Sequence, residues 1–127
     1  ASSGDDKISW YENDGSEAFT PHTITTTADG AYSVFAADVD GDGDMDVLSA
    51  SSGDDKIAWY ENDGSGAFTP HTITTTADGA FSVFAADVDG DGDMDVLSAS
   101  SGLENIARYQ RDGSGAFRPP TITTTTD

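Results

Sequence analysis

The stretch SVFAADVDGDGDMDVLSAS, residues 33–51, decides the fold of this chain, and it returns unchanged at residues 82–100. Five aspartates alternate with other residues at its centre, and runs rich in Val, Phe, Ala and Leu flank them. β-Branched and aromatic residues favour a pleated strand, whereas Asp and Gly favour turns. The pattern therefore predicts a strand over Tyr32–Val39, an acidic loop, and a second strand over Met45–Ala50.

Outside this stretch, the whole sequence repeats with a period of 49 residues. Residues 1–49 and 50–98 differ at three positions, and residues 99–127 match 50–78 with nine changes, among them Trp59 to Arg108 and His71 to Pro120. A terminal repeat often differs because it faces a different neighbour. We expect a single repeat array over 1–127, made of repeat 1 (1–49), repeat 2 (50–98) and a partial, divergent repeat 3 (99–127). Such close identity favours either recent duplication or engineering.

Two further strands are expected in each period, at Lys56–Glu61 and Ala67–Thr75 in the second copy, with Gly-rich and Asp-rich turns between them. In the first of these, Ile57 and Trp59 share one face, and Ala58 and Tyr60 share the other. Both faces are therefore expected to be buried. Four short antiparallel strands per repeat are typical of one propeller blade. The predicted fold class is all-β, with β-propeller blades of four antiparallel strands.

The number of copies predicts about 2.5 blades per chain: an orphan half-blade at 1–29 and full blades at 30–78 and 79–127. Propellers typically close with about 4–8 blades, so this chain cannot close a ring alone. The half-blade would also leave an unpaired strand edge, which favours pairing with another chain. We expect a homo-oligomer that completes the ring; the alternative is that the chain is a fragment of a longer array.

The acidic loop DVDGDGDMD, at 38–46 and 87–95, carries the strongest chemical signal, with ten of the 24 acidic residues. Carboxylates this close repel one another, so a cation is expected to stabilise the folded loop. Oxygen donors without Cys or His favour Ca²⁺ over Mg²⁺, because Ca²⁺ accepts flexible coordination. The loop begins like an EF-hand, but its twelfth position is Ser49 instead of Glu, and strands flank it instead of helices. We therefore expect a structural calcium site of another kind.

The same stretch, followed by KIAWYENDGSGAF at 56–68, resembles the FG-GAP/VCBS-type repeats that build the integrin α-subunit propeller. Similar repeats occur in fungal sugar-binding propellers. The resemblance implies that the loop between the first two strands of a blade binds Ca²⁺, with two ions per chain. A literal Phe-Gly…Gly-Ala-Pro motif is absent. The ligands implied are the side chains of Asp38, Asp40, Asp42 and Asp46 with the carbonyl of Asp44, and the side chains of Asp87, Asp89, Asp91 and Asp95 with the carbonyl of Asp93.

Three functions are compatible with this fold. The first is a calcium-stabilised module that serves as an extracellular binding or adhesion scaffold, where calcium is plentiful. The second is a carbohydrate-binding, lectin-like propeller with shallow sites between blades; the third is a purely structural or designed repeat assembly. An enzyme is not expected, because near-identical repeats multiply every residue whereas a catalytic site is usually single. His22 and His71 are interpreted as surface or edge histidines without convergent partners. The possible ligand-contact residues are Trp10, Tyr11, Trp59 and Tyr60, for which the alternative is an inter-blade core.

Composition excludes several other classes of partner. The formal charge of −19 and the pI of about 4.1 oppose contact with phosphate, so neither nucleic acid nor anionic membranes are expected as partners. The longest apolar runs have the length of VFAA at 34–37, far below the roughly 20 residues that span a bilayer, so no membrane insertion is expected. The chain has no Cys and therefore no disulfide framework. Residues 1–10 lack the features of a signal peptide, so we expect any secretion signal to be removed or to lie outside this chain.

Overall fold

A computed structural model of the chain describes residues 1–102 and 104–118, and its regular elements there are β-strands. No helix long and apolar enough to cross a membrane occurs in this described part. The strands are β1 (Ile8–Asn13), β2 (Phe19–Thr25), β3 (Ala31–Ala37), β4 (Asp46–Ser51), β5 (Lys56–Asn62), β6 (Phe68–Thr74), β7 (Ala80–Ala86), β8 (Asp95–Ser100) and β9 (Asn105–Tyr109).

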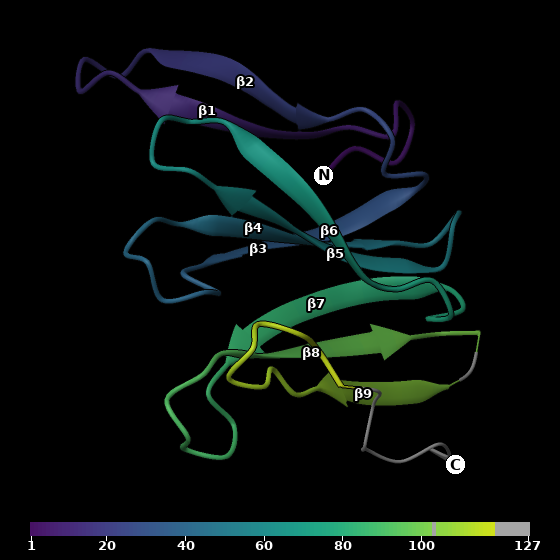
Figure 1. Cartoon of the computed structure of the whole chain (residues 1–127). Coiled ribbons are helices and arrows are strands. Elements are labelled where there is room, and N and C mark those ends of the chain that lie inside the picture. Colours follow the sequence, from purple (N-terminus) through teal and green to yellow (C-terminus); the bar gives the residue numbers. More distant parts are fainter. Residues whose placement is uncertain (103, 119–127) are drawn as a thin grey trace.

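The strands form three antiparallel sheets that follow one another along the chain (Figure 1). The first sheet pairs β1 with β2, the second has the order β3-β4-β5-β6, and the third has the order β7-β8-β9. The predicted all-β fold class with blade-like antiparallel sheets is confirmed. The predicted last blade, 79–127, continues into residues 119–127, which lie outside the described residues. Closure of a ring by further chains stays a prediction.

The strand leading into the first acidic loop ends earlier than the sequence pattern predicts. The expected strand reached Val39, whereas β3 ends at Ala37, opposite Asp46 of β4. The cause is a side chain: the Val39 amide donates to Oδ2 of Asp46 at 2.9 Å and so leaves the strand ladder. The other three strands predicted for this blade lie within one residue of their expected bounds.

The main core lies between the second and third sheets. Leu48, Ile57 and Trp59 from the second sheet pack in one cluster with Val83 and Val96 from the third. A smaller cluster joins the first sheet to the second. β5, in the middle of this stack, is buried on both faces as predicted, because it has a sheet on each side (Figure 1).

The exposure of one tyrosine position shows that the outer face of the first sheet has no covering sheet among the described residues. Tyr60 on β5 is 4% exposed, whereas Tyr11, its repeat equivalent on β1, is 63% exposed. Tyr60 faces away from Trp59, and therefore toward the first sheet. Tyr11 has no preceding sheet to pack against within the described residues. The outer face of the first sheet thus exposes Tyr11 among polar side chains such as Ser9 and Thr23, and no other sheet of the described residues covers it.

Candidate functional site

The first acidic loop, residues 38–46, connects β3 to β4 and is shaped by hydrogen bonds from its own backbone. Both carboxylate oxygens of Asp38 accept amide hydrogens, from Gly41 at 2.8 Å and from Gly43 at 3.0 Å. These two glycines have φ of 82° and 98°, in the left-handed region that glycine adopts without steric cost. Oδ1 of Asp42 similarly accepts from the Asp44 amide at 2.8 Å. The loop therefore curls around its own carboxylates.

This curl brings three of the predicted ligands together. Asp38, Asp40 and Asp42 each offer a carboxylate oxygen within 4.8 Å of the others. Burial and the neighbouring negative charges of Asp42, Glu61 and Asp38 raise the pKa of Asp40, although a hydrogen bond from the Asp42 amide opposes the shift. A site that gathers only hard oxygen donors at this spacing suits a Ca²⁺ ion.

Asp46, at the start of β4, is the buried anchor of the same loop. It is 0% exposed, and it accepts amide hydrogens from Val39 at 2.9 Å and from Asn62 at 2.8 Å. Burial, the largest cause, raises its pKa despite these hydrogen bonds. No ion pair to Asp46 is present among the residues that the structure describes. A buried carboxylate that feels the negative charges of Asp40 and Asp42, with no basic side chain of the described residues paired to it, fits a loop completed by a cation.

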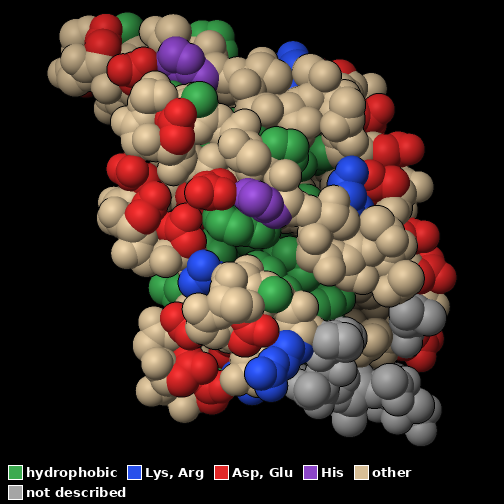
Figure 2. Space-filling model, in the orientation of Figure 1, with side chains coloured by type: hydrophobic (Ala, Val, Ile, Leu, Met, Phe, Trp, Pro, Cys, Tyr) green, Lys and Arg blue, Asp and Glu red, His purple; other side chains and the backbone are tan. Residues whose placement is uncertain are grey.

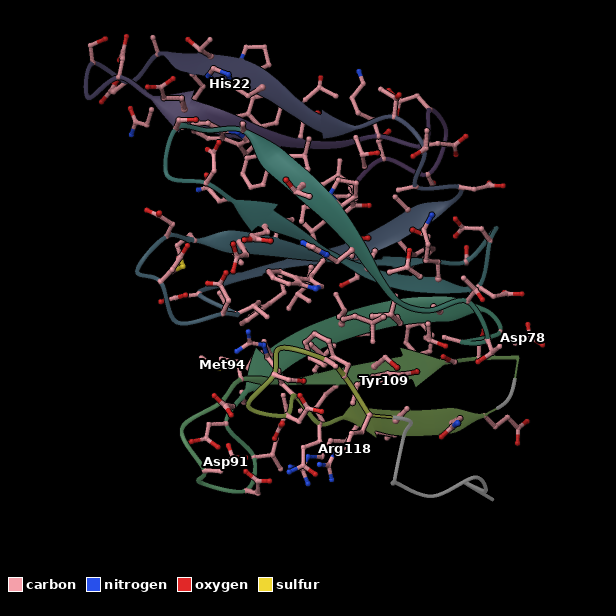
Figure 3. The ribbon with its side chains drawn as sticks, in the orientation of Figure 1. His22, Asp78, Asp91, Met94, Tyr109 and Arg118 are labelled. Atoms are coloured by element: carbon pink, nitrogen blue, oxygen red, sulfur yellow. The ribbon has the colours of Figure 1, made fainter. Side chains whose placement is uncertain are left out.

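The second acidic loop, residues 87–95, repeats this backbone arrangement on the same side of the molecule (Figure 1). Asp87 accepts from the Gly90 amide at 2.8 Å and from the Gly92 amide at 2.9 Å. Figure 3 shows Asp91 and Met94 in this loop, between β7 and β8. The carboxylates that lie within 4.8 Å of one another are those of Asp87, Asp89 and Asp95, a different set from that of the first loop.

The two groups differ because the side chains of Arg108, on β9, and of Gln110, the residue after β9, enter the second loop. An NH2 nitrogen of Arg108 donates to Oδ2 of Asp89 at 2.6 Å and to Oδ2 of Asp95 at 2.8 Å. Gln110 donates to the same Asp89 oxygen at 2.8 Å. The hydrogen bond from Arg108 is the main cause that lowers the pKa of Asp89. The second loop thus contains a positive charge of its own.

Four predicted ligands lie outside these two close groups. Asp46 and Asp44 are not members of the first group, and Asp91 and Asp93 are not members of the second. The carboxylate of Asp44 points at the turn after β5, where a Cβ added to Gly64 would come within 2.7 Å of it. This orientation is compatible with the resemblance, which assigns Asp44 and Asp93 a backbone carbonyl role.

Between the sheets lie two repeat-equivalent pockets, at the place where the lectin-like alternative expects shallow sites between blades. The first, of about 560 Å³, is lined by Trp10, Glu12 and His22 of the first sheet together with residues of the second. The second pocket is lined by Trp59, Glu61 and His71, with Asp40 at its edge. Figure 2 shows one face of the molecule, where apolar side chains gather centrally and acidic ones lie along both sides.

The interpretation of both histidines as lacking convergent partners is wrong. His71 stacks on Trp59 with ring centroids 4.6 Å apart, and its Nε2 lies 2.7 Å from Glu61. His22 does the same with Trp10 and Glu12. Register explains the stack, because Trp59 pairs directly with His71 across β5 and β6. The signal in the sequence was that Trp59 and His71 stand at equal distances on either side of the turn between β5 and β6.

The aromatic residues proposed to contact a ligand are placed unequally. Trp59 and Tyr60 are buried between sheets, Trp10 is half-buried in the first pocket, and Tyr11 is exposed. Trp10 lines the first inter-sheet pocket, whereas Tyr11 lines a separate pocket on the outer face of the first sheet. In repeat 3 the Trp and Glu positions hold Arg108 and Gln110, and the His position, Pro120, lies outside the described residues.

Comparison with known protein families agrees with this geometry. The family model of the FG-GAP-like repeat matches three overlapping segments, residues 1–49, 38–98 and 87–127, which together cover the chain. No individual curated protein matches the chain. Each matched segment contains all or part of an acidic loop and at least one of the strand pairs described above. The chain therefore belongs to the FG-GAP-like repeat family.

Proposed function

We propose that this chain is a calcium-binding propeller repeat module that serves as an extracellular binding or adhesion scaffold. The observation that carries the proposal is the first acidic loop, where three carboxylates converge. Asp46, at the end of this loop, is fully buried and feels the charges of Asp40 and Asp42, and no basic side chain of the described residues is paired with it. Such a loop is electrostatically unfavourable as it stands, and a divalent cation removes that cost.

The aspartates would hold the ion through oxygen atoms alone. In the first loop these are Asp38, Asp40 and Asp42, with Asp46 as the buried support, and the equivalent positions serve in the second loop. A bound Ca²⁺ would supply neutralising charge and fix the connection between the first two strands of each blade. The residues themselves curl the loop and keep the carboxylates in place through their backbone hydrogen bonds.

Thermal denaturation in calcium, in magnesium and in EDTA tests this proposal. A ligand present at 100 times its dissociation constant stabilises a folded protein by about 2.7 kcal/mol, so calcium should raise the melting temperature. Magnesium should raise it less, because Mg²⁺ demands a tight octahedron that this loop does not impose. An unchanged melting temperature in EDTA and in saturating calcium would contradict calcium binding.

The scaffold role follows from the repeated construction of the chain. The first two repeats present nearly the same residues twice, an arrangement suited to repeated contacts with a partner and unlike a single catalytic centre. We propose that the chain is not an enzyme. Further copies of the chain would complete the ring, because the outer face of the first sheet exposes Tyr11 where Tyr60 is covered.

A carbohydrate is the second candidate ligand, and the first inter-blade pocket favours it. Trp10 stacks on His22 there, and Glu12 and Asn62 add polar groups to the lining. An aromatic face beside hydrogen-bonding groups is suited to a sugar ring. A glycan array probed with the wild-type chain and with Trp10→Ala, each with and without EDTA, tests this role. Binding that Trp10→Ala removes would support it, and an array without any bound glycan would contradict it.

A further inference from the structure

The two acidic loops have identical sequences but different neighbours. Position 59 is Trp beside the first loop, and the equivalent position beside the second loop is Arg108. Position 61 is Glu beside the first loop, and its equivalent is Gln110. Both changes alter charge in the same direction, since a neutral residue becomes positive and an acidic residue becomes neutral.

The structure places both changed side chains on the carboxylates of the second loop. Arg108 donates three hydrogen bonds there, from Nε to Asp95 at 3.2 Å and from NH2 to Asp95 at 2.8 Å and Asp89 at 2.6 Å. Its side chain is 16% exposed, and Asp95 is fully buried. Such a fork of charge-assisted hydrogen bonds in a largely buried setting is strong. Arg108 therefore occupies the oxygen atoms that an incoming cation would need.

Beside the first loop the same positions offer no such competitor. Trp59 is apolar and stacks on His71, while Glu61 lies with Asp40 around one pocket and adds negative charge. No lysine or arginine forms an ion pair with the first loop within residues 1–102 and 104–118. The first loop depends on an external cation for the neutralisation that Arg108 supplies to the second.

We propose that the two loops differ in calcium affinity because Arg108 acts as a built-in cation in the second loop. Calcium fills the first loop first, and it enters the second only by displacing Arg108 from Asp89 and Asp95. This inference rests on the proposed calcium binding. With a buried, hydrogen-bonded ion pair to break, we expect the second loop to bind at least about tenfold more weakly than the first.

Isothermal titration with calcium alone tests the inference in chains that keep one loop each. Asp87→Ala disables the second loop and leaves the first, whereas Asp38→Ala at the equivalent position disables the first and leaves the second. We expect the Asp38→Ala chain to have the higher dissociation constant, by about tenfold or more. Adding Arg108→Gln to Asp38→Ala should recover most of that loss, because it removes the competing charge.

Arg118→Thr in the Asp38→Ala background is the matched control. It removes one positive charge from the same repeat and restores the residue of repeat 2, but Arg118 pairs with Asp112 and touches neither loop. It should leave the dissociation constant of the second loop unchanged. Equal affinities in the two single-loop chains, or equal effects of Arg108→Gln and Arg118→Thr, would overturn the inference.

The wild-type titration gives a second measurement that needs no variant to fold. Two separated phases of unequal affinity, the first with one ion per chain, would support the inference, and one phase of two equal sites would overturn it. If neither single-loop chain nor the wild type binds calcium, the proposed function itself is wrong and this inference falls with it.

Discussion

At the scale of the residue, one buried aspartate meets two different environments. Asp46 and Asp95 begin equivalent strands, and both are fully buried. Each accepts two backbone hydrogen bonds, but Asp95 is also paired with Arg108, whereas Asp46 has no basic partner among the described residues. A buried charge is ordinarily paired or coordinates a metal. The chain supplies that partner itself at Asp95 but not at Asp46.

Asp46→Asn should destabilise the calcium-free chain. The amide oxygen of Asn can accept from only one side, so either the Val39 or the Asn62 amide loses its acceptor. A buried donor left unpaired costs about 1–3 kcal/mol, which urea denaturation in EDTA can measure. Asp44→Asn in the same loop is the control, and it should change the free energy of unfolding by less. Equal effects of the two substitutions would contradict the structural role of Asp46.

Residue patterns predicted the curled acidic loop, but they did not predict that Arg108 enters its second copy. Alternating aspartates with two glycines predict a curled loop of clustered oxygen donors, because glycine permits the positive φ that the curl needs. Arg108 looked like one divergent residue of a terminal repeat. Its contact with Asp89 and Asp95 depends on the register of β8 against β9 and on the curvature of the loop, which no local pattern in one sequence encodes.

At the scale of the element, β5 shows that the position of a strand in the stack sets how much its side chains contribute to stability. β5 lies between two sheets, whereas its equivalent β1 has a covering sheet on one face only within the part of the chain that the structure describes (Figure 1). The periodic pattern predicted all strands of the described sheets, since apolar alternation and turn residues are local signals. It did not predict how far each copy is buried, because burial depends on the neighbour that each sheet has.

Trp59→Ala should therefore cost much more stability than Trp10→Ala. Trp59 is 6% exposed and packs in the main core, so its truncation should cost about 3–5 kcal/mol. Trp10 is half-buried and should cost distinctly less. Urea denaturation of both variants measures the difference, with each variant serving as the matched control of the other. Equal losses would mean that the two sheets are equally covered.

The acidic loop as an element should make calcium stabilisation depend on pH. Burial raises the pKa of Asp40 and of Asp46 above the ordinary 3.8, so without calcium the folded chain holds these protons more readily than the unfolded chain. Keeping these carboxylates ionised destabilises the calcium-free folded chain at neutral pH, and lowering the pH toward 3.8 removes this cost by protonating them. Calcium needs the ionised carboxylates, so the two effects oppose each other.

The rise in melting temperature on adding calcium should accordingly be smaller at about pH 5 than at neutral pH. Asp63 and Asp112, whose pKa values are lowered by hydrogen bonds, lie outside both acidic loops, and they lose their stabilising effect only as pH falls below 3.8. Parallel melting curves at the two pH values, in calcium and in EDTA, make the measurement. A larger calcium effect at the lower pH would contradict the ionised-carboxylate site.

At the scale of the whole molecule, three sheets form a stack, and no sheet of the described residues covers the outer face of the first one. The first sheet has two strands, and Tyr11 on its outer face is exposed, whereas the equivalent Tyr60 is buried. If further copies complete a ring, native mass spectrometry in calcium should show an oligomer. A folded monomer at every concentration would contradict this expectation.

Tyr11→Glu should dissociate that oligomer without unfolding the chain, because it places a charge on the uncovered face. Tyr32→Glu is the matched control, since Tyr32 is 65% exposed but lies on β3, outside that face. Circular dichroism checks that both variants keep their β-structure. Oligomers of equal size in both variants would exclude the outer face of the first sheet as the contact.

The near-identity of the repeats has a consequence for how the chain finds its fold. Residues 1–29 and 50–78 differ at two positions, so the edge of β4 cannot distinguish its own β5 from the β1 of another molecule. What favours the correct partner is the short turn at 52–55, which acts as a tether. A tether of this kind imposes a local concentration on the order of millimolar. When the chain refolds at high protein concentration, β1 of another molecule therefore competes with the tethered β5 for the edge of β4.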